Sequence, residues 1–375
     1  MSLIYLIILI IAALVLERLS SRNPFDRLRH EMTPDKGVLE PEEEFSITTT
    51  ISNGKSRPVL FLKLEENVPP GLVLLDSDSP DFRVQTALYN SKTQAKLMQT
   101  LYVLPRQKLS RTLRVRLDSR GRYLFHDGKM MVGDLLGFEE NVQQLSYIKE
   151  VVVLPRRISA PDTDAAFGNY LGDISVRRFI LSDPILTAGF REYSGREPMK
   201  DISWPASLRQ GKLMVKQFDY TAELTATVLL SIDGGNPEEI ELCYSLARHI
   251  CEQLEDKRVS YSFLTGAYVA NSAGRWTFMG EGLGDKHLSA ILEGLGRASH
   301  ESLFSFEKLL SKIGPQNGSN KAFILVCPPL KREDKLAIAR FENRVGGRVF
   351  VVEADTESFG KNDAESASSG KEAAA

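Results

Sequence analysis

The 375-residue chain has little cysteine and no excess of either charge. Its 47 Lys and Arg residues are balanced by 49 Asp and Glu residues, which leaves no basic surplus to neutralise a phosphate backbone. Nucleic acid is therefore not expected as a partner. Three cysteines are too few for a disulfide framework, and Cys243 and Cys251 fall in one expected helix, too far apart along its axis to bond. This pattern favours a reducing compartment.

The sequence also lacks a recognisable catalytic constellation. The five histidines are scattered, and His249 and Cys251 lie two residues apart in a helix, so their side chains point to different faces. The glycine-rich run at 280–285 lacks the Gly-Lys-Ser/Thr ending of a phosphate-binding loop. We therefore predict that the protein is not an enzyme and has no catalytic residue, no cofactor and no small-molecule substrate. A hydrolase whose residues meet only in the fold is the alternative.

The longest apolar run is at the N-terminus, where every residue from Leu3 to Leu16 is apolar. A helix over residues 1–16 spans about 24 Å, and residues 17–19 extend it to the bilayer interface. No charge precedes the run, which is the reverse of a signal peptide, and arginines follow it at positions 18, 22, 27 and 29. We therefore expect a single-pass anchor over residues 1–19 with the rest of the chain cytoplasmic, a buried core helix being the alternative.

Short runs of period-two alternation, separated by turn residues, occupy residues 29–157. Phe45–Ile51 and Leu113–Leu117 each alternate apolar with polar side chains, and Asn53-Gly54 marks a turn. The pattern predicts an all-β, immunoglobulin-like sandwich. Basic residues concentrate between positions 106 and 122. We interpret them as a solvated strand face, contact with anionic lipid being the alternative.

From residue 222 the pattern changes to apolar strands that alternate with helical spacing. Thr225–Ile232 is a nearly continuous apolar strand, and Pro237–Glu255 has the spacing of a helix. Residues 267–270 and 275–278 are expected to pair as a hairpin. The alternation predicts an α/β, doubly wound, mostly parallel sheet over residues 222–356. Residues 357–375 are predicted to form a disordered tail, because their composition falls to Ala, Ser, Gly, Glu and Lys.

Residues 158–221 join the two domains, and their second half is dense in charged and aromatic residues. Arg191, Tyr193 and Gly195 lead through Asp201 to Ile202-Ser203-Trp204, and then to Ala206, Arg209, Gly211 and Leu213. This run closely resembles the signature of the bacterial "domain of unknown function 58" family, in which Ile-x-Trp is followed by Ala-x-x-Arg-x-Gly-x-Leu. Arg120-Gly121-Arg122-Tyr123 and the Gly133–Phe138 turn also resemble that family. Gly195-Arg196 and Trp204-Pro205 depart from its usual Gly-Asp and Trp-Lys/Arg pairs.

The resemblance implies a protein of the bacterial cell membrane in which the sandwich precedes a von Willebrand A-like domain. It attaches no enzymatic activity, and it points to a MoxR-type AAA+ ATPase as the protein partner. The candidate partner-binding residues are those of the signature: Arg191, Tyr193, Gly195, Asp201, Trp204, Arg209 and Gly211. The structural alternative is a strap that clamps the two domains, with its arginines paired to neighbouring acids and Trp204 covering an apolar sheet edge.

A metal-binding von Willebrand A domain carries Asp-x-Ser-x-Ser in the loop after its first strand. Here Gly235 and Pro237 replace both hydroxyl residues, while Asp233 is retained. We therefore predict a degenerate metal-site loop, with Asp233, Gly235 and Asn236 and no bound metal. One alternative is a metal-dependent adhesion module that binds Mg²⁺ through Asp233. Another is that Asp233 and Asn236 cap the helix beginning at Pro237.

Together these features predict a non-enzymatic, membrane-tethered interaction or scaffold protein.

Overall fold

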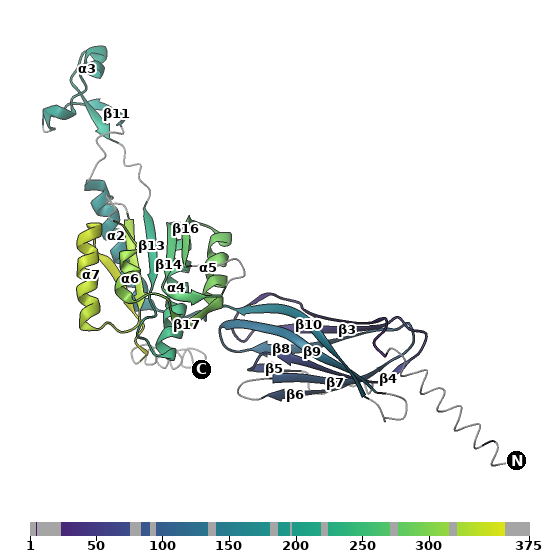
Figure 1. The fold of residues 1–375 in the computed structure, drawn as a ribbon. Coiled ribbons are helices and arrows are strands. Elements are labelled where there is room, and N and C mark those ends of the chain that lie inside the picture. The colour runs from purple at the N-terminus through teal and green to yellow at the C-terminus, as the bar shows by residue number, and fades with distance from the viewer. Residues whose placement is uncertain are drawn as a thin grey trace, which may run out of the picture. The chain divides into compact units, whose positions relative to one another are not determined.

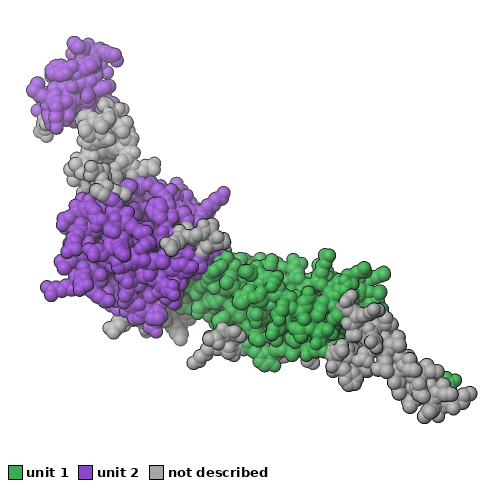
Figure 2. All heavy atoms as spheres, viewed as in Figure 1, with its two compact units in different colours: residues 1–156 green, residues 157–375 purple. Residues whose placement is uncertain are grey.

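The computed structural model describes Tyr5 and residues 24–75, 84–90, 95–133, 140–180, 187–195, 197–218, 224–270, 277–314 and 321–356. Two compact units, residues 1–156 and 157–375, are distinguished in Figure 2. Apart from Tyr5, the anchor expected at residues 1–19 lies outside the described residues, as does the tail expected at 357–375. No helix of the described residues combines the length and hydrophobicity that crossing a bilayer requires.

The first unit is a β-sandwich of two sheets (Figure 1). One sheet has the strand order β1-β3-β8-β5, and the other has the order β2-β10-β9-β4-β7-β6. Paired strands are antiparallel except β2 and β10, which are parallel. The strands are β1 Leu28–Pro34, β2 Val38–Leu39, β3 Glu44–Asn53, β4 Val59–Val68, β5 Leu72–Leu74, β6 Val84–Asn90, β7 Ala95–Val103, β8 Lys108–Leu117, β9 Gly121–Gly133 and β10 Glu140–Val153.

Strand alternation decides which side chains lie between the sheets. Phe45 and Ile47 of β3 are buried, and each is followed by a half-buried polar residue. In β8, Leu113 and Val115 are buried, while Arg114 between them is exposed. The β-sandwich expected from the period-two pattern is thus confirmed, because successive side chains of a strand point to opposite faces.

One carboxylate lies inside this sandwich core. Glu66 on β4 is completely buried, and its Oε1 atom is 2.8 Å from Nε2 of His30 on β1. The Thr49 hydroxyl and the Gln99 side-chain amide each donate to its Oε2 atom at 3.3 Å. The Tyr147 ring packs on His30 with 5.5 Å between centroids, and burial raises the pKa of its hydroxyl. Because His30 and Thr49 belong to one sheet and Glu66 and Gln99 to the other, the cluster joins the two layers.

The second unit contains a sheet of order β16-β14-β13-β18-β19, in which β16 alone is antiparallel to its neighbour. Its strands are β13 Thr225–Leu230, β14 Ser260–Thr265, β16 Phe278–Gly282, β18 Lys321–Cys327 and β19 Val349–Glu353. The mostly parallel α/β sheet is confirmed. The expected hairpin is wrong, because β15 (Ala267–Val269) pairs with β17 (Ala298–Ser302), whereas β16 joins β14.

Helices cover both faces of this sheet (Figure 1). On one face, α6 and α7 pack against Phe323 and Leu325 of β18. On the other face, Phe350 of β19 contacts the rings of Phe167 and Tyr170 on α2. Helix α4 contacts β13, β14 and β18, and it lies beside α5. The helices are α2 Pro161–Ile180, α4 Pro237–Asp256, α5 Asp285–Arg297, α6 Phe306–Ser311 and α7 Arg332–Val345.

Helix α2 lies in the stretch that the sequence pattern assigned to a linker. Its Tyr170 hydroxyl accepts a hydrogen bond from Phe323 N at 3.0 Å and donates to the Arg348 carbonyl at 2.9 Å. Its Asp164 Oδ1 atom is 2.6 Å from Nε2 of His249 on α4. The first part of residues 158–221 is therefore a helix held on the α/β sheet.

The second part of that stretch forms a small body of its own, which we call the signature module (residues 187–218). Strands β11 (Thr187–Glu192) and β12 (Met214–Phe218) pair antiparallel, and between them lie a 3₁₀ turn, η1 (Met199–Asp201), and helix α3 (Trp204–Gln210). Ile202, Met214 and Val215 are buried. Arg196 lies outside the described residues.

Candidate functional site

The carboxyl ends of β13 and β18 lie side by side in the sheet, and the helices that follow them diverge. Helix α4 follows β13, whereas α7 follows β18 and packs on the opposite face. In open α/β sheets this divergence marks the crevice where ligands bind. The loop at 233–236, predicted as a degenerate metal site, and the loop at 328–331 face each other there.

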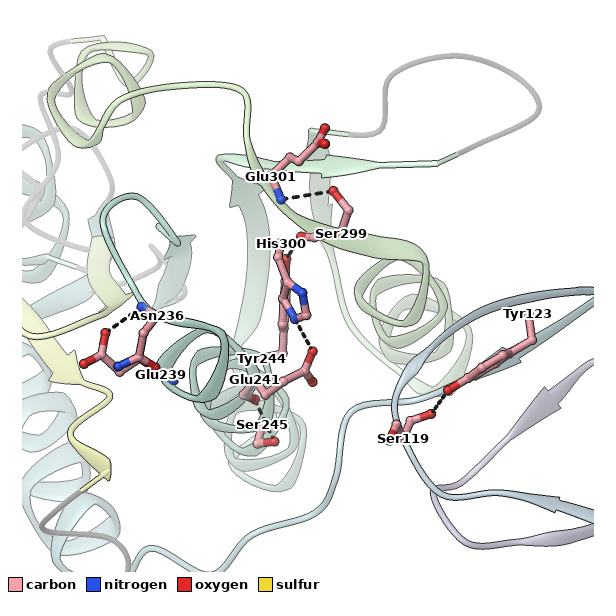
Figure 3. A network of polar contacts seen from close by, with 10 residues as sticks. All are labelled: Ser119, Tyr123, Asn236, Glu239, Glu241, Tyr244, Ser245, Ser299, His300 and Glu301. Atoms are coloured by element: carbon pink, nitrogen blue, oxygen red, sulfur yellow. Dashed lines mark hydrogen bonds and ion pairs between the residues drawn. The ribbon is translucent and has the colours of Figure 1, made fainter. Parts of the chain in front are cut away.

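Asp233 and Asn236 of this loop cap two different helices. Asn236 Oδ1 accepts from Glu239 N at 2.9 Å, and Glu239 Oε2 accepts from Asn236 N at 2.9 Å, so a reciprocal capping box begins α4 (Figure 3). Asp233 Oδ2 instead accepts from Phe306 N at 3.0 Å, at the first residue of α6. The expectation that both residues cap the helix at Pro237 is corrected: Asn236 does so alone.

The loop residues do not fit a divalent cation. A Cβ atom at Gly235 would lie 2.7 Å from Cγ of Pro328, so no hydroxyl side chain can stand there unless Pro328 moves. The Lys331 ammonium lies beside Gly234, 3.1 Å from where a Cβ atom would be. Magnesium requires an octahedral shell of oxygens, whereas this loop supplies a single carboxylate and has the Lys331 ammonium beside it. Across the described ranges, no three His, Cys, Asp or Glu side chains gather in a metal-binding group.

The cysteines are equally unsuited to chemistry. Cys243, Cys251 and Cys327 are free and completely buried. Burial raises the pKa of each of these thiols well above its ordinary value. Because the thiolate is the reactive form, these residues act as packing groups.

Two polar contacts fasten α4 to β17 (Figure 3). The Tyr244 hydroxyl donates to the Ser299 carbonyl at 2.7 Å. His300 Nε2 lies 2.6 Å from Glu241 Oε1, and both of these side chains are largely exposed. His300 therefore has a partner on α4, and this contact holds β17 against that helix.

In the signature module, a short network fixes the turn after β11. Arg191 Nη2 lies 2.6 Å from Glu197 Oε1. The Ser194 hydroxyl donates to Glu197 Oε1 at 2.6 Å, and Ser194 N donates to Oε2 at 3.1 Å. These hydrogen bonds, that of the Ser194 hydroxyl first, lower the pKa of Glu197 to about 2. The expected pairing of signature arginines with neighbouring acids is thus confirmed for Arg191 and Glu197, and it is wrong for Arg209, which has no acid within ion-pair distance among the described residues.

We expect this turn to remain ordered in mild acid. Because the folded-state pKa of Glu197 is depressed, its contribution to stability is complete above the ordinary glutamate pKa of about 4.3 and is lost as the pH falls towards 2. The Ser194 amide proton shift, followed by NMR, should titrate with a midpoint near 2. A midpoint near 4.3 would contradict the network, and the Glu197→Gln variant should abolish the titration.

Other residues of the signature allow the backbone turns of the module or hold its helix against its strand. Gly195 has φ 88° and Gly211, the C-cap of α3, has φ 67°, a conformation that favours glycine at both positions. The Ser207 hydroxyl donates to the Ser203 carbonyl at 2.8 Å and accepts from Met214 N at 2.8 Å, which fixes α3 to β12. Tyr193 N donates to the Leu213 carbonyl at 2.8 Å. Asp201 lies in η1 and Arg209 in the last turn of α3.

Apolar side chains remain on the surface of the module. Trp204 is 57% exposed, so it does not cover a sheet edge as the strap interpretation expected. Leu208, four residues later on the same helix face, is 85% exposed, and Met199 is 69% exposed. We call these three exposed residues the apolar face: Trp204 and Leu208 share one side of α3, and Met199 lies in the preceding turn η1. Trp204 was predicted from the sequence as a binding residue, whereas Met199 and Leu208 were not; the i, i+4 spacing of Trp204 and Leu208 was the available signal.

No family model matches the chain, and no curated protein matches it. Among solved structures, a cohesin module from a Clostridium perfringens family 33 glycoside hydrolase matches with TM-score 0.27 and 10% identity, covering 34% of this chain and 96% of the module. A type II cohesin domain from the Acetivibrio cellulolyticus cellulosome matches with TM-score 0.25 and 12% identity, over 33% of this chain and 94% of that one. The CARDB domain of a Pyrococcus furiosus protein matches with TM-score 0.21 and 15% identity, over 34% and 91%. These structures are similar to the β-sandwich of the chain.

Proposed function

We propose that this chain is a non-enzymatic, membrane-tethered docking protein whose signature module binds a protein partner. One observation carries the proposal: the module has a small core of its own, yet it leaves Trp204, Leu208 and Met199 largely exposed. Exposed apolar clusters on folded proteins mark interaction sites, and Trp, Met and Arg are enriched at protein interfaces. Trp204 is the expected anchor of the contact.

The α/β sheet supports a role without chemistry. At the crevice, Pro328 leaves no room for a side chain at Gly235, and Asp233 is engaged at the start of α6. We assign the α/β unit as a degenerate von Willebrand A-like domain, which fits its strand order and its diverging α4 and α7. We also assign the first unit as an immunoglobulin-like sandwich.

The sequence supplies the rest of the proposal. The apolar run Leu3–Leu16, followed by arginines, supports a membrane anchor with the two units in the cytoplasm. The signature supports membership of the "domain of unknown function 58" family, and hence a MoxR-type AAA+ ATPase as the partner to test first. No observation at the crevice favours the Mg²⁺-dependent alternative.

Site-specific photo-crosslinking tests the docking face. A photoreactive amino acid at position 208 should give a protein adduct in native membranes, and Trp204→Ala should lower its yield about tenfold, the effect of losing roughly 1.4 kcal/mol of binding free energy. The matched control is Leu336 on α7, a leucine that is 58% exposed. A photoreactive group at 336 should give no such adduct, and Leu336→Ala should leave the 208 adduct unchanged.

The identity of the adduct then tests the partner. A MoxR-type ATPase in the 208 adduct would support the family inference. If positions 208 and 336 give the same adducts in equal yield, the module is not a docking site and the proposal fails.

A further inference from the structure

We infer that the surface bound by the apolar face is an apolar protein groove rimmed by carboxylates. This inference rests on the proposed function and specifies the chemistry of its partner. The apolar face supplies the contacts that enter the groove, in the mode of a helix laid into a hydrophobic cleft. The charged residues of the module near that face indicate which charge the rim of the partner's groove carries.

The signature module is basic within a slightly acidic chain. Residues 187–218 contain six basic and three acidic residues, whereas the whole chain has a net charge of −2. Two of the acids are already engaged, since Glu197 contacts Arg191 at 2.6 Å and Glu192 lies 3.4 Å from Lys212. The surplus charge of the module is therefore positive.

Two of the surplus basic residues are chain neighbours of apolar-face residues. Lys200 follows Met199, and Arg209 follows Leu208; both basic side chains are exposed. Within the described residues, neither Lys200 nor Arg209 has an acid within ion-pair distance. An apolar anchor with an adjacent cation is complementary to an apolar groove edged by Asp or Glu, and such complementarity controls encounter and register.

The internal hydrogen bonds of the module favour a protein over a lipid surface as its partner. The Ser207 hydroxyl joins α3 to β12, and Ser194 and Glu197 are joined by hydrogen bonds in the turn after β11. A preorganised shape strengthens binding to a complementary groove because less ordering entropy is lost. A fluid bilayer places no such requirement on shape, since interfacial binding depends on apolar area and charge.

Charge reversal in the full-length chain tests the inference with the 208 adduct as readout. In native membranes, Lys200→Glu with Arg209→Glu should lower the yield of the protein adduct at least fivefold. The wild-type yield should fall several-fold between 50 and 300 mM NaCl, because the Debye length shortens from roughly 14 Å to roughly 6 Å. Arg332→Glu with Lys335→Glu, an equal reversal of exposed residues on α7, should change nothing. Amide exchange at Met214 and Val215 verifies that the module is folded in each variant.

The other possible outcomes contradict either the acidic groove or the docking function. If the yield of the 208 adduct changes with neither charge reversal nor salt, the acidic groove is wrong and the proposed docking function is unaffected. A lipid adduct at 208, with binding to phosphatidylcholine–phosphatidylglycerol vesicles (7:3) abolished by Trp204→Ala, would replace the groove by a membrane surface. No adduct at 208 would remove both proposals together.

Discussion

Replacing Glu66 with alanine is expected to lower the free energy of unfolding of the β-sandwich by about 3–5 kcal/mol. The substitution removes the acceptor for His30, Thr49 and Gln99, all held within 3.3 Å of a carboxylate that has no exposure. Each buried polar group left without a partner costs roughly 1–3 kcal/mol, and the deleted side chain leaves a cavity as well. Hydrogen exchange of β4 and β7 amides in the full-length chain measures the change.

Two further variants test whether the destabilisation comes from losing the buried carboxylate of Glu66 and not simply from removing a glutamate. Glu66→Gln keeps one side-chain carbonyl acceptor, so it should destabilise the sandwich less than Glu66→Ala. Glu44→Ala removes an acid whose side chain is 58% exposed and 3.8 Å from Arg114, so it should cost less than about 1 kcal/mol. Equal protection of β4 amides in the Glu66→Ala variant and the wild type would contradict the buried cluster as a stabilising element.

Replacing Gly235 with serine, which would add a hydroxyl group at the crevice, should lower the free energy of unfolding of the α/β unit by about 1–3 kcal/mol. The new Cβ atom would meet Pro328 Cγ at 2.7 Å and Ile240 Cγ1 at 3.2 Å, and the helix that begins next to this loop leaves little room for adjustment. Thermal unfolding of the full-length chain, with and without Mg²⁺, measures the effect. We expect the midpoint to fall and Mg²⁺ to leave it unchanged.

The control is Gly347→Ser, whose Cβ atom would have no neighbour within 4 Å. This variant should unfold at the temperature of the wild type. A Gly235→Ser chain that is stable and gains further stability from Mg²⁺ would show that the loop accommodates a cation, and the metal-dependent alternative would regain its basis.

Side-chain periodicity was enough to predict the two kinds of sheet. Period-two alternation in Phe45–Ile51 indicates a strand with one buried face, and the nearly continuous apolar sequence of β13 indicates a strand that is covered on both faces. Both signals are local, because each depends only on the faces of one strand. The β15–β17 pairing was missed because strand partners far apart in the chain leave no local signal.

Helix α2 shows where the local signal weakens. Phe167, Leu171 and Ile174 are buried at helical spacing. Gly168 and Gly172, however, interrupt the stretch, and each glycine costs roughly 1 kcal/mol in a helix interior. Packing of Phe167 and Tyr170 on β19 supports this helix, and sequence reading does not detect such tertiary contacts.

The sequence named the candidate residues, but it could not predict the contacts that these residues make. The signature residues were predicted as a group, and the loop at Asp233 was placed at the end of the first parallel strand. The role of Asp233 depends on Phe306, 73 residues later in the chain. The exposure of Trp204 depends on the small size of the module, since a body of 187–218 with few buried residues has no interior for an indole ring.

The signature module is an insertion between two fixed points of one sheet. Helix α2 is held by the Tyr170 hydroxyl at the amino ends of β18 and β19, and the chain returns to the sheet as β13, its central strand. Substitutions on the outer surface of the insertion leave both attachment points untouched. Natural selection can therefore change which molecule is recognised while the underlying sheet folds as before.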